Sequence, residues 1–412
     1  MADAPNHNCA TVAAAVAADS DHAGDTPAST EDLRHVYVHI PFCARICPYC
    51  AFYKELLDRA QTSRFCEALL RELAQYVLAT ASPSGGEQHR PAVGSRHLLP
   101  STIYFGGGTP SALSTHQLEF LLKGFRDRLD LSELREWTLE ANPGSVSARK
   151  ARLLQELGIN RISLGVQSWH DGLLELLGRE HSAQQAEESF WILRTAGFAN
   201  INIDLMFGLP GQTAEQWRES LTRTIGLAPE HISTYCLTYE EDTEFFQRHA
   251  RAELHSDTNA EAEFFEMTMA ILQEAGYVHY EISNYARPGF ESLHNRAYWA
   301  GEDYLGIGPS AFSTVAMQRW QNVCDYRVYA ERVLSGRSAV GAVENLTGEM
   351  KRRERIALDL RTRNGVSAEL LMTNAEQVRD MVTLGLLQHV NDKFALTGRG
   401  KLLADSVAEA FF

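Results

Sequence analysis

The sequence has 412 residues, of which 53 are acidic and 38 basic, giving a formal net charge of −15. Its hydrophobic share of 44% is that of an ordinary globular protein, so a wholly disordered or fibrous chain is excluded. The excess of acidic residues does not provide the basic surface that binds nucleic acid. No apolar run approaches the roughly 20 residues of a membrane-spanning helix.

The start of the chain does not resemble a targeting signal. Residues 1–33 contain six acidic residues and no Lys or Arg, whereas secretory and mitochondrial signals need basic residues. The small, polar composition of this stretch predicts a disordered tail. Three of the seven cysteines fall within eight residues, which favours a metal or redox site in a reducing compartment over a disulfide framework. We therefore expect a cytoplasmic protein.

Residues 34–275 alternate short strand-like runs with amphipathic helical stretches. The strand-like runs are 35–40, 102–105, 136–140, 161–165, 200–206 and 231–237. The helical stretches are about 56–79, 115–129, 147–157, 182–196, 213–227 and 258–275. This alternation predicts an α/β fold with a parallel sheet. Because only six units precede the change of pattern, we expect a partial (β/α)6 barrel, open where a full TIM barrel closes with eight.

The rest of the chain breaks this rhythm. Residues 81–100 are rich in Pro, Gly and Ser, which predicts a loop. Residues 276–345 carry many aromatic side chains and are interpreted as a connecting region. Residues 346–412 form a new helical pattern, which we interpret as a small, winged-helix-like C-terminal domain.

Polar residues and glycines gather where the predicted strands end. The residues at these ends are Cys43 to Cys50, Gly106 to Thr109, Glu140 to Asn142, Gln167 and Asp204. Because the chemistry of parallel barrels lies at the carboxyl ends of their strands, we expect these residues to share one site.

The strongest signal is the spacing Cys43-x3-Cys47-x2-Cys50 on one short loop. Three thiolates can hold three irons of a [4Fe–4S] cluster and leave the fourth iron open to another ligand. A structural zinc site completed by His39 is an alternative, although structural zinc usually takes two separated pairs of ligands. Three free thiols are the remaining interpretation.

This cysteine loop after the first strand of a partial barrel resembles that of the radical S-adenosylmethionine superfamily. The segments Tyr37–Cys43, Tyr104–Ser111, Gly158–Arg161 with Gly165–Ser168, and Asp204–Pro210 are similar to the oxygen-independent coproporphyrinogen III oxidase group. The resemblance implies an S-adenosylmethionine pocket lined by Tyr37, Gly107, Gly108, Thr109, Glu140, Gln167, Arg179 and Asp204. Glycine backbone permits close approach of the cofactor, carboxylates suit ribose hydroxyls and an ammonium group, and an arginine suits a carboxylate. Taken singly, the glycines could be a mobile turn, and Glu140 and Arg179 could form surface ion pairs.

Two features distinguish the branches of this group. The oxidases carry an additional cysteine two residues after the third, where this chain has Phe52. The run Cys47-Pro48-Tyr49-Cys50-Ala51-Phe52 is similar to the haem chaperone branch, the HemW family, except that Ala51 replaces an Asp. The segment His294–Trp299 resembles the His-Asn-x-x-Tyr-Trp haem motif of that branch.

The resemblance therefore implies a haem chaperone that delivers haem to respiratory apoproteins. It also implies a [4Fe–4S] cluster, S-adenosylmethionine and a low-potential electron donor such as flavodoxin. His294 is the candidate haem ligand, although a lone histidine in a loop is more often a hydrogen-bonded structural residue. No residue is assigned a catalytic role. The alternatives are a coproporphyrinogen III oxidase, a radical enzyme with another substrate, and a non-catalytic scaffold.

Overall fold

The computed structural model describes residues 32–81 and 96–412. The predicted tail, apart from its last two residues, and most of the predicted loop over 81–100 lie outside the described residues.

All six predicted parallel strands are present and adjacent, which confirms the partial barrel. Their bounds are β1 Leu33–Ile40, β4 Leu98–Gly107, β5 Glu136–Ala141, β6 Arg161–Gln167, β7 Ile201–Phe207 and β8 His231–Cys236. They pair in the order β1-β4-β5-β6-β7-β8, each parallel to the next. The helices between and after them are α1 Thr62–Ala81, α2 Thr115–Arg126, α3 Ala148–Glu156, α5 Ala183–Thr195, α6 Ala214–Gly226 and α8 Thr258–Glu274.

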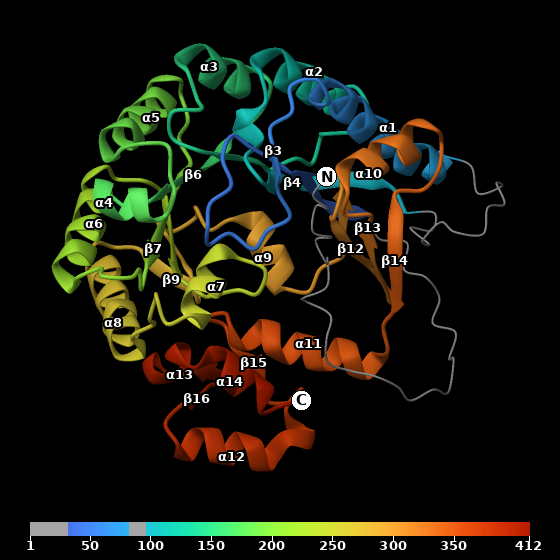
Figure 1. The fold of residues 1–412 in the computed structure, drawn as a ribbon. Helices are drawn as coiled ribbons and strands as arrows, with labels where there is room; N and C mark the ends of the chain where they lie inside the picture. The colour runs from blue at the N-terminus through green and yellow to red at the C-terminus, as the bar shows by residue number, and fades with distance from the viewer. Residues whose placement is uncertain (1–31, 82–95) are drawn as a thin grey trace.

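Each strand presents one face to the helices and the other to the interior of the barrel. In β1, Val36, Val38 and Ile40 belong to the hydrophobic core that packs against the helices. The residues that alternate with them, including His35 and Tyr37, face the opposite way because successive strand residues point to opposite faces. The helices form an arc outside the sheet (Figure 1). The inner face is therefore a polar lumen, in contrast to the apolar interior of a closed TIM barrel.

Short elements missed by the sequence analysis follow four of the parallel strands, β1, β4, β6 and β8. These are β2 Phe42–Cys43, β3 Glu55–Leu56, a 3-10 turn Pro110–Ala112, α4 Asp171–Leu176 and α7 Glu244–Ala250. Most of these elements are too short for a periodic pattern of hydrophobic residues to be recognised in the sequence.

The region 276–345, interpreted above as a connection, extends the main sheet at both edges. Its strands are β9 Val278–Glu281, β10 Asn284–Ala286, β11 Tyr304–Ile307, β12 Phe312–Val315, β13 Gln318–Asn322 and β14 Val340–Asn345. Strand β11 pairs in parallel with β1, and β10 pairs antiparallel with β8. Helix α9 (Leu293–Trp299) lies inside the arc of helices, and α10 (Tyr326–Leu334) packs on α1 (Figure 1).

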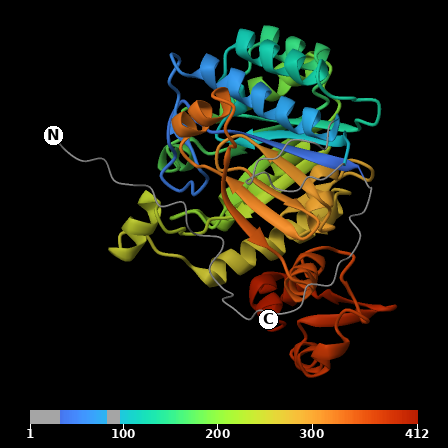
Figure 2. The same cartoon turned by 90° about the vertical axis from the view of Figure 1, so that its right-hand side faces the viewer.

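The C-terminal segment has a hydrophobic core of its own, which includes Ile356, Leu360 and Leu387. Its elements are α11 Gly348–Leu360, β15 Val366–Ser367, a 3-10 turn Met372–Asn374, α12 Ala375–Thr383, β16 Leu387–Val390, β17 Lys393–Leu396, α13 Gly398–Leu402 and α14 Ala404–Glu409. These helices and the three-stranded sheet form a lobe beneath the barrel (Figure 2). Across the described ranges, no helix has the length and apolar character needed to cross a membrane.

Candidate functional site

The three cysteines lie on a loop that begins where β1 ends. Strand β2 pairs with β3, which closes the loop at its base, because Glu55 N donates to Pro41 O at 2.8 Å and Leu57 N to Cys43 O at 2.9 Å. A tight turn brings Cys50 N to 3.2 Å from Cys47 O. All three thiols are half-buried. The loop therefore presents three sulfur ligands from a short, anchored segment.

A ring of side chains connects two of these thiols across the ends of three strands. Thr109 Oγ1 donates to Cys43 Sγ at 3.4 Å and accepts from Asn142 Nδ2 at 3.1 Å. Asn142 Oδ1 accepts from Arg179 Nη2 at 2.7 Å, and Arg179 Nη1 points to Cys47 Sγ at 3.8 Å. Asn142 is a link that the sequence analysis placed at a strand end but did not assign to the site. It lies two residues after Glu140, just past the end of β5, and an uncharged amide in that place carries no signal of its own.

The zinc alternative requires His39 as a fourth ligand, and the structure gives that imidazole other partners. His39 Nδ1 hydrogen-bonds Tyr37 OH at 3.1 Å, and its Nε2 hydrogen-bonds Tyr53 O at 3.0 Å. Among residues 32–81 and 96–412, no three His, Cys, Asp or Glu side chains converge closely enough to hold one metal ion. In a tetrahedral zinc site all ligands lie about 2.0–2.3 Å from a single ion. With both ring nitrogens of His39 engaged, the zinc alternative lacks its fourth ligand.

The glycines after β4 pack against the chain that carries Cys43. A Cβ atom on Gly107, whose φ is +107°, would lie 2.5 Å from the His39 ring, and one on Gly108 would lie 2.5 Å from Pro41 O. Gly108 N also donates to Ile40 O at 2.8 Å. The need for glycine at these positions therefore comes at least in part from packing within the protein. The expectation that bare backbone serves cofactor approach is not tested by this geometry.

Two carboxylates face the lumen from β5 and β7, the strands on either side of β6. Glu140 accepts hydrogen bonds from Tyr104 OH at 2.8 Å and Gly107 N at 3.1 Å. Asp204 accepts from Ser163 Oγ at 2.9 Å and Asn202 Nδ2 at 2.8 Å. Burial raises the pKa of Glu140 to about 7 and also raises the pKa of Asp204. Within the described residues neither forms an ion pair, so both can accept a cationic group of a ligand.

Arg179 and Gln167 meet at Gly165 on β6. Arg179 Nη2 donates to Gly165 O at 2.7 Å, and the Nε2 atom of Gln167 lies 3.0 Å from the position of a Cβ on Gly165. Gln167 itself has a φ of +67°, an unusual conformation for a residue with a side chain that clusters at functional sites. The structure therefore brings Arg179, Gln167 and Asn142 together near Cys47.

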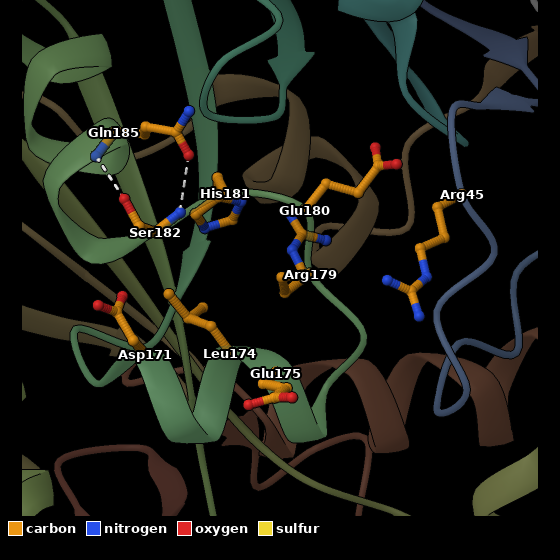
Figure 3. A pocket seen from close by; sticks show the side chains of 9 residues that line it. All are labelled: Arg45, Asp171, Leu174, Glu175, Arg179, Glu180, His181, Ser182 and Gln185. Carbon is orange, nitrogen blue, oxygen red and sulfur yellow. Dashed lines mark hydrogen bonds between the residues drawn. The ribbon is translucent and has the colours of Figure 1, made fainter.

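A pocket of about 370 Å³ opens beside this group, and Arg179 is the predicted cofactor residue that lines it. In Figure 3, Arg45 extends from the cysteine loop toward the segment that carries Arg179 and Glu180. Asp171, Leu174 and Glu175, at the start and along α4, form another wall.

The predicted haem ligand lies at the opposite end of the lumen. His294 is in α9, not in a loop as expected, and is 1% exposed. Glu136 fixes the start of this helix by accepting from Leu293 N at 2.8 Å and His294 N at 3.1 Å. His294 Nδ1 is 2.7 Å from Thr102 Oγ1, while its buried Nε2 has no hydrogen-bond partner.

Aromatic rings surround His294. Tyr104 stacks on the imidazole with a centroid distance of 5.1 Å, and Tyr298 contacts it edge-on at 4.6 Å. Burial lowers the pKa of His294 to about 3, so the imidazole is neutral at physiological pH. Trp299, at the end of the same motif, lies under the guanidinium of Arg361 at 5.5 Å. His294 thus provides a neutral imidazole whose Nε2 has no hydrogen-bond partner, with Tyr104 stacked on one face and Tyr298 in edge-on contact.

Comparison with known proteins shows where the chain belongs. The family model of the radical SAM superfamily matches residues 96–223. "Heme chaperone HemW" of Lactococcus lactis is 36% identical over 91% of this chain and 96% of that protein. The Bacillus subtilis protein of the same name is 34% identical over 92% of this chain and 99% of its own length.

A solved structure has the same fold. Coproporphyrinogen III oxidase (HemN) from Escherichia coli, described as a radical SAM enzyme, aligns with a TM-score of 0.76 over 92% of this chain and 90% of that chain. At 24% identity this likeness supports the fold alone. The two relatives, in contrast, match nearly from end to end at more than 30% identity. The chain belongs to the HemW family of the radical SAM superfamily.

Proposed function

We propose that this protein is a haem chaperone that binds haem through His294 and delivers it to respiratory apoproteins. The observation that carries the proposal is the buried Nε2 of His294, which has no partner and lies between Tyr104 and Tyr298. An unprotonated imidazole nitrogen is a good axial ligand for haem iron, and aromatic rings pack on a macrocycle. Relatives that match this chain at 34–36% identity bear the name "Heme chaperone HemW".

Burial of His294 has a consequence for this function. Because the side chain is 1% exposed, haem reaches Nε2 only after α9 moves away from β4. The C-terminal lobe contacts the end of α9 through Arg361 on Trp299 and through Arg355, which donates to Ala300 O. Movement of the C-terminal lobe would break these contacts and release α9.

Membership of the superfamily implies a [4Fe–4S] cluster and S-adenosylmethionine. We propose that Cys43, Cys47 and Cys50 hold the cluster. The cofactor residues proposed are Tyr37, Gly107, Gly108, Thr109, Glu140, Gln167, Arg179 and Asp204. When bound, the cluster supplies an electron of low potential and an open iron position. Glu140 and Asp204 balance positive charge on the ligand, while Arg179 orients a carboxylate next to Cys47.

We further propose how these tasks are divided along the chain. Residues 34–275 hold the cluster and S-adenosylmethionine, 276–345 hold the haem motif, and 346–412 form the C-terminal lobe. The proposed external partners are haem, a respiratory apoprotein and a low-potential donor such as flavodoxin. We place the protein in the cytoplasm because three ligating thiols need a reducing compartment.

The test incubates reduced, cluster-containing protein without oxygen in two separate assays. With haem, we expect binding, a changed absorption spectrum in His294→Ala, and transfer to an apoprotein that depends on the cluster. With S-adenosylmethionine and coproporphyrinogen III, we expect no protoporphyrinogen by chromatography. Efficient decarboxylation of coproporphyrinogen III would contradict the chaperone function and support the oxidase function. Phe52, which stands where the oxidases carry their additional cysteine, is 70% exposed.

A further inference from the structure

A chain of hydrogen bonds leads from the protein surface to the buried imidazole of His294. Glu302 Oε2 lies 2.8 Å from His35 Nε2, and His35 Nδ1 lies 2.9 Å from Thr102 Oγ1. The same Thr102 oxygen lies 2.7 Å from His294 Nδ1. The Glu302 side chain is 54% exposed, whereas His35 and Thr102 are buried.

The chemistry of these groups determines where each proton lies. The carboxylate of Glu302 can only accept, so a His35 that carries a single proton holds it on Nε2 and donates it to Glu302. The chain of hydrogen bonds is that of this singly protonated form. His35 Nδ1 is then a bare acceptor, and the hydroxyl of Thr102 donates its single proton to it. Thr102 has no further proton to give, so the remaining contact requires His294 to donate from Nδ1.

The opposite arrangement leaves two acceptors facing each other. If Thr102 donated to His294 Nδ1, His35 would have to donate to Thr102 from its own Nδ1. A neutral His35 would then present a bare Nε2 to the Glu302 carboxylate at 2.8 Å. Two lone pairs at that distance repel, and a buried acceptor would be left without a donor.

We propose that Glu302, His35 and Thr102 are positioning residues that hold His294 in the tautomer whose Nε2 is unprotonated. This inference rests on the proposed function for its purpose, since a bare Nε2 is what haem iron requires of its ligand. The proton positions themselves do not depend on haem. In metal sites a ligating histidine commonly donates its other N–H to such a partner, which fixes its tautomer.

The anchoring of His294 makes the relay effective. Glu136 holds the first backbone N–H groups of α9, and Tyr104 stacks on the ring. A half-turn of the imidazole about its Cβ–Cγ bond would keep these contacts but place Cδ2 where Nδ1 lies, and so would lose the hydrogen bond to Thr102. The hydrogen bond to Thr102 is therefore the contact that determines the tautomer of His294.

The direct test is nuclear magnetic resonance of the full, haem-free chain labelled with ¹⁵N-histidine. The His294 signals are identified by their loss in His294→Gln. We expect a protonated Nδ1 and an unprotonated Nε2 in the wild type. Thr102→Ser keeps the hydroxyl and should preserve this pattern, whereas Thr102→Val removes the acceptor at Nδ1 and should shift protonation toward Nε2. Glu291→Gln is the control, because Glu291 lies before the same helix but bonds neither histidine.

Haem titration provides the second measurement. Loss of a partner that orients a metal ligand typically costs about 10- to 100-fold in affinity, so we expect weaker haem binding of that order in Thr102→Val and not in Thr102→Ser. A protonated Nε2 in the wild type, or an unchanged Nε2 in Thr102→Val, would overturn the relay. Correct tautomers without haem binding would leave the relay standing and reject the proposed function. Haem binding with the wrong tautomer would reject only the relay.

Discussion

Replacement of Gly107 by alanine tests whether this glycine is required by its contact with His39. An alanine at a φ of +107° costs about 1–2 kcal/mol in backbone strain alone. Its Cβ would also lie 2.5–2.9 Å from three atoms of the His39 ring, so the ring must move. Movement breaks the hydrogen bonds of His39 to Tyr37 and Tyr53, at about 1 kcal/mol each. We therefore expect Gly107→Ala to destabilise the protein by about 3–4 kcal/mol.

The double variant Gly107→Ala/His39→Ala separates the cost of backbone strain from the cost of the contact with His39. In a His39→Ala background the ring is absent, so Gly107→Ala should cost only the backbone strain of about 1–2 kcal/mol. The coupling between the two substitutions should thus be about 2 kcal/mol, which is within the range for residues in contact. Urea unfolding of cofactor-free protein, followed by tryptophan fluorescence, measures all four species. If the free-energy costs of the two single substitutions simply add in the double variant, Gly107 is not required by its contact with His39. The need for glycine would then be explained by close approach of the cofactor.

Three further predictions concern the cofactor site. Anaerobically reconstituted protein should hold about four irons per chain, and the triple Cys43/Cys47/Cys50→Ala variant should hold almost none; bound zinc in place of iron would contradict the cluster. Thr109→Val removes the O–H donor to Cys43 Sγ, so the cluster potential should fall by about 40–60 mV, measured by redox titration, with Thr109→Ser as the control. Because burial raises the pKa of Glu140 to about 7, its charge appears only as the pH rises through that value. S-adenosylmethionine binding should therefore strengthen between about pH 6 and 8, while the stability of cofactor-free protein falls from about pH 4.5 upward. Calorimetry of Glu140→Gln should show no strengthening of binding over this range and a smaller loss of stability than the wild type, because Asp204, whose pKa burial also raises, still contributes. A pH dependence of binding that persists would assign it to another group.

The sequence predicted those parts of the fold that have a strong local pattern. Strands such as β1 alternate buried apolar residues with polar ones, and their positions were predicted to within a few residues. Strands β11 to β14 were missed because they are four to six residues long and β14 is almost wholly exposed. The pairing of β11 with β1 depends on contacts between residues about 270 positions apart, such as His35 with Tyr304, which no local pattern reveals.

The residues of the candidate site that the sequence predicted are those with a local pattern, and the residues that it missed are those defined by distant partners. Cysteine spacing and strand-end residues are local, and the structure places Cys43, Thr109 and Arg179 in one hydrogen-bonded ring. Asn142 completes that ring, but an uncharged amide gives no signal until its partners are known. The partners of His294 were likewise hidden, because Thr102 precedes it by 192 residues.

Tyr104 explains how events at one end of the lumen affect the other. Its hydroxyl donates to Glu140 at 2.8 Å, while its ring stacks on His294 at 5.1 Å. A ligand that draws the Glu140 carboxylate toward itself weakens the hydrogen bond that fixes the Tyr104 ring. The ring then packs less tightly on His294, and α9 is held less firmly in the lumen. Under the proposed function, in which haem reaches His294 when α9 moves, Tyr104 would couple occupancy of the proposed S-adenosylmethionine site to access to the proposed haem ligand.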